Sequence, residues 1–412
     1  MNEPRLELAE VFRGEERRFL EVFGRTLSAE QRRAFRAISV CRTAALGGHV
    51  QQCDRCGHRR VAYNSCRNRH CPKCQAAARA TWLDARAAEL LPVPYFHIVF
   101  TLPAVLGPVA LQNPRGVYGI LFRAASETLL ELADDPKHLG ARIGLLAVLH
   151  TWGQTLVHHP HIHCVVPGGG ISHDGSRWVG CDKDFFLPVR VLSRVFRGKF
   201  VDLLKRAYRG GKLAFHGKLL PLSRPPMFER LLNTSVKHDW VVYAKRPFGG
   251  PRQVLKYLAC YTHRVAISNR RLVRLADGKV TFRYKDYAQG GRQRTMTLDA
   301  VHFTRRFLLH VLPSGMVRIR YYGFLSHRCR GRQLRLAQRL LGCGGGDQGG
   351  TSPPVPESDR EPPDEDHSFR CPCCGVGQMR VIEKLHPQHA SSHCYRRRGR
   401  VHLPRMPPGP RR

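Results

Sequence analysis

Two short cysteine turns place the tightest constraint on how this chain can fold. Cys53 and Cys56 form one CxxC turn, Cys71 and Cys74 form a second, and fourteen residues separate the two turns. Four thiolates presented from two tight turns make the closed tetrahedral ligand set of a structural zinc ion. We therefore expect these four cysteines to bind one Zn²⁺, and the surrounding module to need that ion for folding.

Other cysteines and histidines are candidates for additional zinc ligands. Two candidates lie between the CxxC turns and could replace one ligand or help to build a second site. Two more, near the C-terminal end, offer half of a further site that nearby histidines or Cys394 could complete. The alternative for each is a buried thiol or a histidine used only in packing. The candidates are Cys66, His70, Cys371 and Cys374, with Cys41 and His49 as more distant ones.

The distribution of the cysteines also bears on the compartment. They cluster at metal-binding spacings, which argues against a disulfide-rich secreted protein. Residues 1–18 are charged and lack the apolar core of a signal peptide. The longest apolar runs are too short to cross a bilayer. We expect a cytoplasmic protein in a reducing environment, without a membrane partner.

A histidine pair in the middle of the chain is a candidate for a second kind of metal site. The sequence His161-Ile162-His163 opens an apolar run that reads as a strand over 161–167. The two-residue period of a strand puts both imidazoles on one face and Ile162 on the other, in the core. Two imidazoles on one face can grip a divalent ion.

The third ligand of that ion should come from a neighbouring strand. His150 is suitably placed if a strand over 143–152 pairs with the histidine strand as an antiparallel neighbour. His97 and Gln154 are weaker alternatives for this position. A polar patch of histidines without any ion is the alternative for the whole cluster.

Two tyrosines lie four residues apart in a segment with helical character, residues 253–264. Tyr257 and Tyr261 therefore project from one face of the expected helix, about one turn apart. The alternative is that both are core residues of an amphipathic helix. A tyrosine hydroxyl has a reference pKa of about 10 and needs help from its site to act as a nucleophile. A divalent ion that neutralises a phosphate supplies such help, so we expect a tyrosine hydroxyl to face the histidines.

The charge of the chain points to nucleic acid. Lys and Arg total 68 against 31 acidic residues, a formal net charge of +37. An excess of this size attracts phosphate backbones, in DNA or, as an alternative, in RNA. Cations interleaved with aromatic residues suit single strands, where bases stack on rings while cations follow phosphates. The candidates for such contacts are Arg283, Lys285, Arg318 and Arg320.

The remaining patterns suggest how the chain is divided. Helical periodicity marks residues 1–40, a strand is expected over 95–102, helices over 117–133 and 189–208, and a hairpin over 271–286. A Gly/Pro-rich acidic stretch reads as a linker. We expect four parts: an N-terminal helical and zinc-binding DNA-binding domain (1–90), a catalytic domain (91–342), the linker (343–368) and a basic tail containing Cys and His (369–412).

Taken together and in this order, these motifs resemble the HUH-type two-tyrosine transposases of rolling-circle insertion sequences. The resemblance covers most of residues 35–342. It is carried by CDRCGHRR…SCRNRHCPKC, YFHIVFTLP, HTWGQTLVHHPHIHCVVPGGG, YLACYTHRVAISNRR and RIRYYGFLSHR. It implies an α+β fold in which helices flank a central antiparallel sheet of the HUH endonuclease type, preceded by a small zinc-binding module.

The resemblance also implies a chemistry. His161 and His163 would be ligands of a catalytic Mg²⁺ or Mn²⁺, and Tyr257 and Tyr261 would be the nucleophiles. The enzyme would nick single-stranded DNA at element ends through a 5′-phosphotyrosine and transfer the strand in rolling-circle transposition. Because imidazole suits Mn²⁺ better than Mg²⁺, Mn²⁺ is the expected activator in vitro. We expect DNA as the partner, with nucleoid association of the bound enzyme.

Two other functions are compatible with parts of this pattern. A rolling-circle replication initiator or relaxase would share the histidine strand and a tyrosine. The zinc module, and the lack of a GxxxxGK[ST] signature of a helicase, favour the transposase. A non-catalytic zinc-dependent DNA-binding regulator would have buried tyrosines and would form no covalent DNA adduct.

Overall fold

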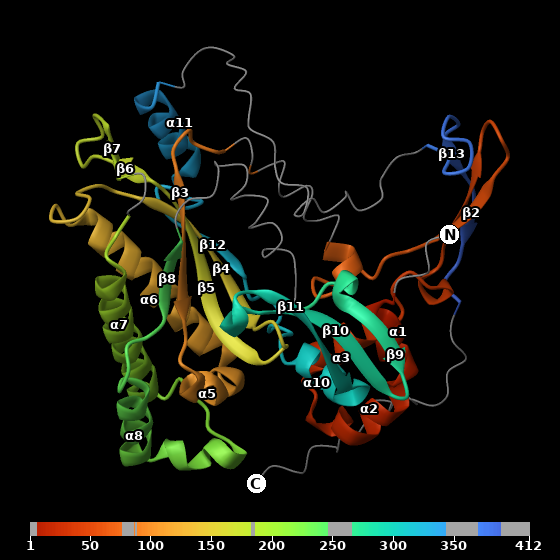
Figure 1. Ribbon diagram of the computed structural model, residues 1–412, viewed down its shortest axis with the longest axis horizontal. Helices are drawn as coiled ribbons and strands as arrows, with labels where there is room; N and C mark the ends of the chain where they lie inside the picture. Colours follow the sequence, from red (N-terminus) through yellow and green to blue (C-terminus); the bar gives the residue numbers. More distant parts are fainter. Residues whose placement is uncertain are drawn as a thin grey trace, which may run out of the picture. The chain divides into compact units, whose positions relative to one another are not determined.

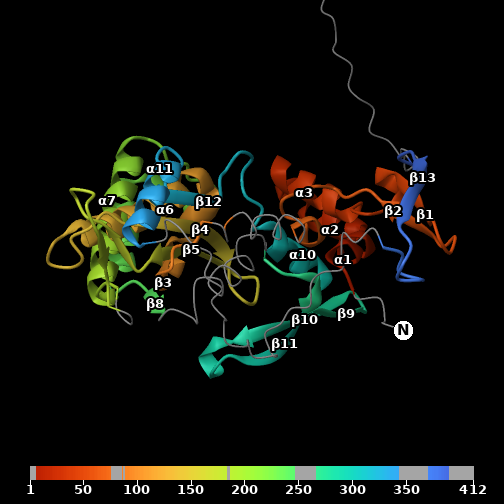
Figure 2. The same ribbon diagram turned by 90° about the horizontal axis from the view of Figure 1, so that it is seen from above.

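The computed structural model describes residues 6–75, 86, 89–182, 186–245, 266–342 and 370–388 (Figures 1 and 2). These residues form two compact units. The larger contains 6–39 and the described residues from 66 to 342, and the smaller contains 40–65 and 370–388. The predicted tyrosine helix at 253–264 and the predicted linker at 343–368 lie outside the described residues. Within the ranges just given, no helix is both long and apolar enough to span a membrane.

A five-stranded sheet forms the centre of the larger unit. Its strand order is β12-β4-β5-β3-β8, and every neighbouring pair is antiparallel. Helices pack against it, so the expected α+β fold with a central antiparallel sheet is confirmed (Figure 1). The strands are β3 (Tyr95–Thr101), β4 (Gly144–Trp152), β5 (His158–Pro167), β8 (Val242–Lys245) and β12 (Ile319–Gly323).

One face of this sheet carries the main hydrophobic core. Alternate residues of the three central strands, such as Ile98, Leu149 and Ile162, are completely buried there. They pack against large apolar residues of the covering helices, including Phe122 and Phe196. These helices are α5 (Gly107–Gln112), α6 (Pro114–Asp134), α7 (Val189–Arg209) and α8 (Pro225–Ser235).

The opposite face is divided along the strands. At one end, Tyr95, Leu146 and Val165 form a second apolar cluster with Leu334 and other residues of helix α11. At the other end the same face carries the histidines. Helix α11 spans Arg330–Leu340. Separately, β6 (Gly169–Ile171) and β7 (Trp178–Gly180) pair to form a small two-stranded antiparallel sheet.

The N-terminal helices pack with a second antiparallel sheet of order β11-β10-β9 and the helix that follows it. Phe12 stacks on Phe35 with ring centroids 5.0 Å apart and meets the edge of Phe307 at 5.5 Å. The predicted helical character of residues 1–40 is confirmed, although as separate helices. The elements are α1 (Leu8–Gly14), α2 (Glu16–Phe23), α3 (Ala29–Ser39), β9 (Leu272–Ala276), β10 (Lys279–Asp286), β11 (Arg292–Asp299) and α10 (Ala300–Leu308).

The predicted hairpin over 271–286 is also confirmed. Asp277 and Gly278, at its tip, have φ of 51° and 65°, the pair of left-handed conformations that a two-residue type I′ turn requires. The third strand, β11, is mostly polar and has no apolar stripe to predict it. Its register with β10 is nevertheless regular from Lys279↔Asp299 to Asp286↔Arg292.

The smaller unit is built on a three-stranded antiparallel sheet of order β13-β1-β2. Its strands are β1 (Gly48–Cys53), β2 (Arg59–Tyr63) and β13 (Met379–Leu385). Strand β13 pairs with β1 from Gly48↔Leu385 to Cys53↔Met379. Residues 370–388 thus fold together with residues 40–65, although the sequence suggests a separate tail.

Candidate active site and metal centres

Three histidines meet on the open end of the central sheet. Strands β4 and β5 pair so that His150 lies directly opposite His161, and His163 lies opposite Val148. The three imidazoles each offer one nitrogen, and these nitrogens lie within 4.8 Å of one another. The antiparallel pairing on which the choice of His150 depended is therefore present, and the structure brings His150, His161 and His163 together.

The local sequence explains this arrangement. In β5, Ile162 points into the helix-covered core while His161 and His163 take the other face. The β4–β5 register shifts between His150 and Trp152, which makes a bulge beside Pro160. A bulge accommodates a proline, since a proline nitrogen has no hydrogen to donate to the ladder.

Hydrogen bonds fix the orientation of two of these rings. The Nδ1 of His161 lies 2.6 Å from the carbonyl oxygen of His159. Because a carbonyl oxygen only accepts, this Nδ1 carries the proton and the lone pair is left on Nε2. The Nδ1 of His163 lies 2.7 Å from the Nε2 of His97, a buried residue of β3. A proton on this Nδ1 likewise leaves the lone pair of His163 on Nε2.

The environment keeps the imidazoles of His161 and His163 neutral near pH 7. Burial lowers the pKa of the half-buried His161 to about 4. It holds the pKa of His163 well below its ordinary value, and His150 and His161 nearby act in the same direction. Metal ions bind the neutral form of imidazole, so burial favours ligation over protonation. His97 stands behind His163 and is not one of the three grouped histidines, whereas the sequence suggested it as an alternative ligand.

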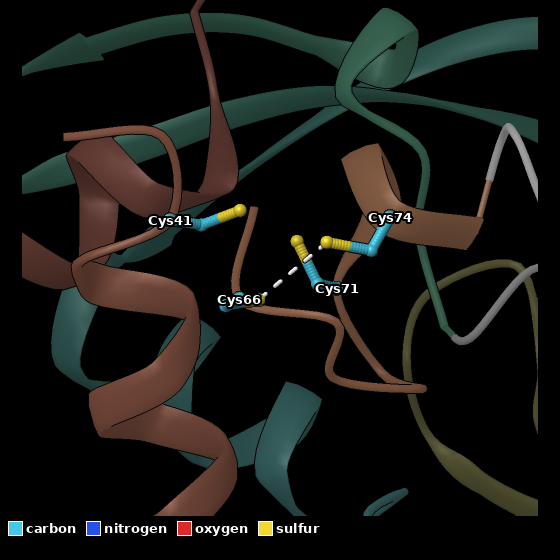
Figure 3. A group of neighbouring side chains, drawn as sticks. All are labelled: Cys41, Cys66, Cys71 and Cys74. Atoms are coloured by element: carbon cyan, nitrogen blue, oxygen red, sulfur yellow. Dashed lines mark hydrogen bonds between the residues drawn. The ribbon is translucent and has the colours of Figure 1, made fainter. Parts of the chain in front are cut away.

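The cysteines form two groups, and each group combines one of the two predicted CxxC turns with two other cysteines. The sulfur atoms of Cys41, Cys66, Cys71 and Cys74 all lie within 4.8 Å of one another, and those of Cys66 and Cys74 are 3.6 Å apart (Figure 3). A second group meets the same criterion and consists of Cys53, Cys56, Cys371 and Cys374. The expectation that Cys53, Cys56, Cys71 and Cys74 gather around one ion is therefore wrong.

The path of the chain explains the different grouping. After Cys56, strand β2 runs back along β1, pairing Arg59 with Gln52 and Tyr63 with Gly48. Five residues of strand carry the chain ~17 Å away from the first cysteine turn. Cys66 follows at that distant end, where the N–H of Arg42 donates to the carbonyl of Asn64. The spacing between the two CxxC turns does not reveal that the chain reverses direction between them and so separates the turns.

His70 belongs to neither cysteine group. Its Nε2 accepts a hydrogen bond from the N–H of Leu312 at 3.2 Å, and its Nδ1 lies 3.1 Å from the Oδ1 of Asn68. Burial lowers the pKa of His70 to about 3, so it is a neutral packing residue. His49 lies on β1 opposite Lys384 and is also outside both groups.

The predicted nucleic-acid contacts fall in different environments. Arg283 and Lys285 are exposed on β10. Arg320 lays its guanidinium over the ring of Phe122 at 4.1 Å, and lines a pocket of about 520 Å³ with Arg115, Tyr321 and other residues. Burial, with the nearby Arg69, lowers the pKa of Arg318 to about 10. Arg283 and Lys285 are thus the more accessible of the four.

The predicted nucleophiles, Tyr257 and Tyr261, lie outside the described residues. Of the other contributors, Cys41 carried the weakest sequence signal, because it is an isolated cysteine twelve residues before the first CxxC turn. His97 had one detectable signal. It is the polar residue within the apolar strand YFHIVFT, where a buried imidazole needs a hydrogen-bonding partner.

Comparisons with known proteins agree with this architecture. The family described as "Putative transposase" (Y2 type) matches residues 144–333, which include β4, β5 and β12. The family described as "Transposase zinc-binding domain" (IS91 type) matches residues 11–102. No solved structure matches the chain significantly.

Two relatives extend the agreement over most of the chain. The chain is 56% identical to "Putative transposase y4qJ" of Sinorhizobium fredii over 380 residues, covering 92% of this chain and 95% of the relative. It is 29% identical to "Transposase for insertion sequence element IS801" of Pseudomonas savastanoi pv. phaseolicola over 306 residues, 71% of this chain and 70% of the relative.

The histidine-bearing sheet and the cysteine groups are thus parts of a transposase, a class of DNA-cleaving enzyme that is expected to bind DNA. The chain is a member of the Y2 transposase family and contains a transposase zinc-binding domain of the IS91 type. The zinc-binding domain and the cysteine groups together support Zn²⁺ as a bound ion.

Proposed function

We propose that this transposase nicks single-stranded DNA at the ends of its element through a 5′-phosphotyrosine and transfers the strand in rolling-circle transposition. The observation that carries the proposal is the group of His150, His161 and His163. One nitrogen of each imidazole lies within 4.8 Å of the other two, and burial keeps His161 and His163 neutral. The hydrogen bonds at the Nδ1 atoms of these two residues leave their lone pairs on Nε2. Such a set fits Mn²⁺ or Mg²⁺ with water and phosphate oxygens as the remaining ligands.

The chain's own residues supply binding and the nucleophile. A divalent ion, when bound, neutralises the oxygens of the scissile phosphate and makes phosphorus more electrophilic. The hydroxyl oxygen of Tyr257 or Tyr261 loses its proton and attacks phosphorus. The bond from phosphorus to the 3′ oxygen breaks, and that oxygen takes up a proton to become a free 3′ hydroxyl. The tyrosine ester retains the bond energy, so a 3′ hydroxyl can reverse the step and join strands without ATP.

The other sites have supporting roles in the proposal. Cys41, Cys66, Cys71 and Cys74 hold a structural Zn²⁺ with four sulfur ligands, a closed set with no position for a substrate. Arg283 and Lys285 are exposed on β10, which also contains Tyr284 and is followed by Tyr287. In the proposal these two cations contact the single strand. These contacts are sequence-independent, since cations follow phosphates.

The experiment is a covalent-adduct assay. The purified chain is mixed with labelled single-stranded DNA that carries the element ends, with and without Mn²⁺, and separated on a denaturing gel. Tyr257→Phe, Tyr261→Phe and the double variant are tested beside the wild type. We expect an adduct that depends on the metal ion and is absent from the double variant. The two single variants rank the tyrosines.

A matched control uses a tyrosine on the other side of the sheet. Tyr208 of α7 stacks on Phe228 at 4.0 Å, and its hydroxyl donates to the carbonyl of Ser223. Tyr208→Phe removes one hydroxyl from this remote position and should leave adduct formation unchanged. A metal-dependent adduct that persists in the Tyr257→Phe, Tyr261→Phe double variant would contradict the proposed nucleophiles. Tight binding of cognate ends without any adduct would favour a non-catalytic DNA-binding protein.

A further inference from the structure

The smaller unit joins two cysteine turns that lie more than three hundred residues apart in the sequence. The Sγ of Cys53 is 3.8 Å from that of Cys374, and the Sγ of Cys56 is 3.5 Å from that of Cys371. All four thiols are free of disulfide bonds. In a tetrahedral Zn–S₄ site, a Zn–S bond of ~2.3 Å places neighbouring sulfurs ~3.8 Å apart. The observed spacings therefore suit a shared zinc ion.

The two turns are built alike. Each has the sequence CxxCG, and Gly57 and Gly375 take left-handed φ values of 72° and 69°. The glycine N–H closes each turn by donating to the carbonyl of the first cysteine, at 3.2 Å to Cys53 and 2.9 Å to Cys371. Only a residue that tolerates positive φ can reverse the chain at this point.

Backbone N–H groups point at the sulfur atoms in both turns. The Sγ of Cys53 accepts from the N–H groups of Arg55 and Cys56 at 3.4 and 3.5 Å. In the second turn, Cys371 accepts from Cys373 at 3.4 Å and Cys374 accepts from Gly377 at 3.3 Å. Donors directed at sulfur favour the thiolate, which is the form that binds a metal ion.

The surroundings hold the two turns face to face. Strand β13 pairs with β1 up to Cys53↔Met379, directly beside the first turn. The Oδ1 of Asp54 accepts from the N–H of Gln378 at 2.9 Å. A side chain at Gly377 would overlap the Sγ of Cys53, so this position requires glycine for the close approach.

This unit has little else to stabilise it. The buried apolar cluster in its described part consists of Cys53, Cys371 and Met379, with Cys374 packed against it. The larger apolar residues of its strands, including Val61, Val381 and Ile382, are about half exposed. A three-stranded sheet without a substantial core is not stable alone and needs a metal ion or another crosslink.

We propose that Cys53, Cys56, Cys371 and Cys374 bind a second structural Zn²⁺, which fastens residues 370–388 to the β1–β2 hairpin. Four thiolates select Zn²⁺ over the divalent ions that prefer oxygen. The matched zinc-binding family ends at residue 102, so this ion would extend the zinc-binding part of the protein to its C-terminal segment. The site is independent of the DNA-nicking chemistry proposed above.

The test measures zinc per chain in the purified full-length protein by elemental analysis. We expect two zinc ions in the wild type and one in the Cys371→Ser, Cys374→Ser double variant. The matched control is Cys373→Ser. Cys373 is an exposed thiol of the same turn and lies outside the group of four, so this variant should retain both ions. A Cys66→Ser, Cys74→Ser double variant should lose the other ion and retain this one.

A second measurement guards against simple misfolding. After exchange of zinc for Co²⁺, the sulfur-to-cobalt absorption of the Cys371→Ser, Cys374→Ser variant should be about half that of Cys373→Ser. Its far-ultraviolet circular dichroism should retain the helical signal of Cys373→Ser and differ at most by the contribution of the small sheet, because the larger unit does not contain these cysteines. Equal zinc content and equal cobalt absorption in the two variants would overturn the proposal. So would a single zinc ion in the wild type that disappears with Cys66 and Cys74.

Discussion

The Nε2 of His97 lies 2.7 Å from the Nδ1 of His163, and the planes of the two imidazole rings differ by only 3°. His97 is on β3 and His163 is on the neighbouring strand β5, so the orientation of the His163 ring depends on two strands of the central sheet. Partners of this kind orient a ligand and raise its basicity, although they do not touch the ion themselves. His97 is in this sense a positioning residue of the proposed metal site.

Replacing His97 should therefore weaken metal binding without removing a ligand. We expect His97→Phe to lower the Mn²⁺ affinity about 10- to 100-fold, in line with the loss of other second-sphere partners of histidine ligands. His97→Gln keeps an oxygen that can accept from the Nδ1 of His163 and should recover part of the affinity. Calorimetric titration with Mn²⁺ measures both. Equal losses in the two variants would indicate that His97 only fills space.

Removing the proposed histidine ligands should abolish Mn²⁺ binding and leave zinc binding by the cysteine groups unchanged. The double variant His161→Ala, His163→Ala should lose Mn²⁺-dependent nicking and measurable Mn²⁺ binding, since one imidazole of the group remains. Its zinc content should equal that of the wild type, because both cysteine groups are untouched. Elemental analysis and the denaturing-gel assay on one preparation give both values. Nicking that survives at the wild-type rate would contradict the metal assignment.

His310 should make the stability of the protein depend on pH. It is buried, its Nε2 lies 3.1 Å from the carbonyl of Leu156, and burial lowers its pKa from 6.5 to about 3. The unfolded chain then binds more protons than the folded one below pH 6.5. As the pH falls from 6.5 towards 3, stability should fall by ~1.4 kcal/mol per pH unit from this residue.

The measurement is urea unfolding at several pH values for the wild type and His310→Gln. Glutamine does not titrate. As the pH falls, the unfolding free energy of the wild type should therefore decrease more than that of His310→Gln. Changes in the rest of the protein, including metal release, are common to both and cancel. A difference that stays constant from pH 7 to pH 4 would contradict the buried neutral histidine.

Asp299 should stabilise helix α10 mainly as a cap. Its carboxylate accepts from the N–H groups of Val301 and His302 at 2.9 and 3.3 Å, and it also pairs with the half-exposed Arg18. Loss of an N-cap costs ~1 kcal/mol, whereas exposed ion pairs contribute less. In urea unfolding we expect Asp299→Ala to lose about that amount and Asp299→Asn to lose clearly less. Equal losses in the two variants would make the ion pair with Arg18 the dominant contact, because both variants remove the charge and only asparagine can still cap the helix.

Arg283 and Lys285 should contribute to binding single-stranded DNA through charge. Replacing both by glutamine should weaken binding and reduce the slope of log affinity against log salt by roughly 1.4, or ~0.7 for each lost phosphate contact. The matched control is Lys237→Gln, an exposed lysine in the loop after α8. Fluorescence anisotropy with a labelled oligonucleotide across salt concentrations tests this. Equal slopes in all three proteins would exclude the hairpin from the DNA contact.

The parts of the fold that follow from local pattern were predictable. Strand β3 has a continuous apolar and aromatic run, and the β9–β10 hairpin has an Asp-Gly turn at its tip. The partnership of His150 with His161 was also predictable, because sequence neighbours in a sheet usually pair as a hairpin. In each case a few adjacent residues determine the result.

The parts that depend on distant contacts were not predictable. Strand β13, MRVIEKL, has no clean alternation and exposes most of its residues, so its sequence does not identify β1 as its partner. The grouping of Cys53 with Cys371 depends on that pairing. Spacing alone favoured Cys71, which is much closer in the sequence. The CxxC turns themselves were recognised correctly, whereas their combination is a property of the tertiary fold.

The pairing of β1 with β13 has a consequence for how the protein is made. A ribosome completes β1 and β2 early, but β13 emerges only after every strand of the central sheet has been synthesised. Until then β1 has one unpaired edge, which is a hazard for aggregation during translation. A gene copy interrupted shortly before codon 370 would encode the whole histidine-bearing sheet and leave that edge permanently open. Truncation of the element in this region would thus produce a protein in which the edge of β1 that normally pairs with β13 is exposed.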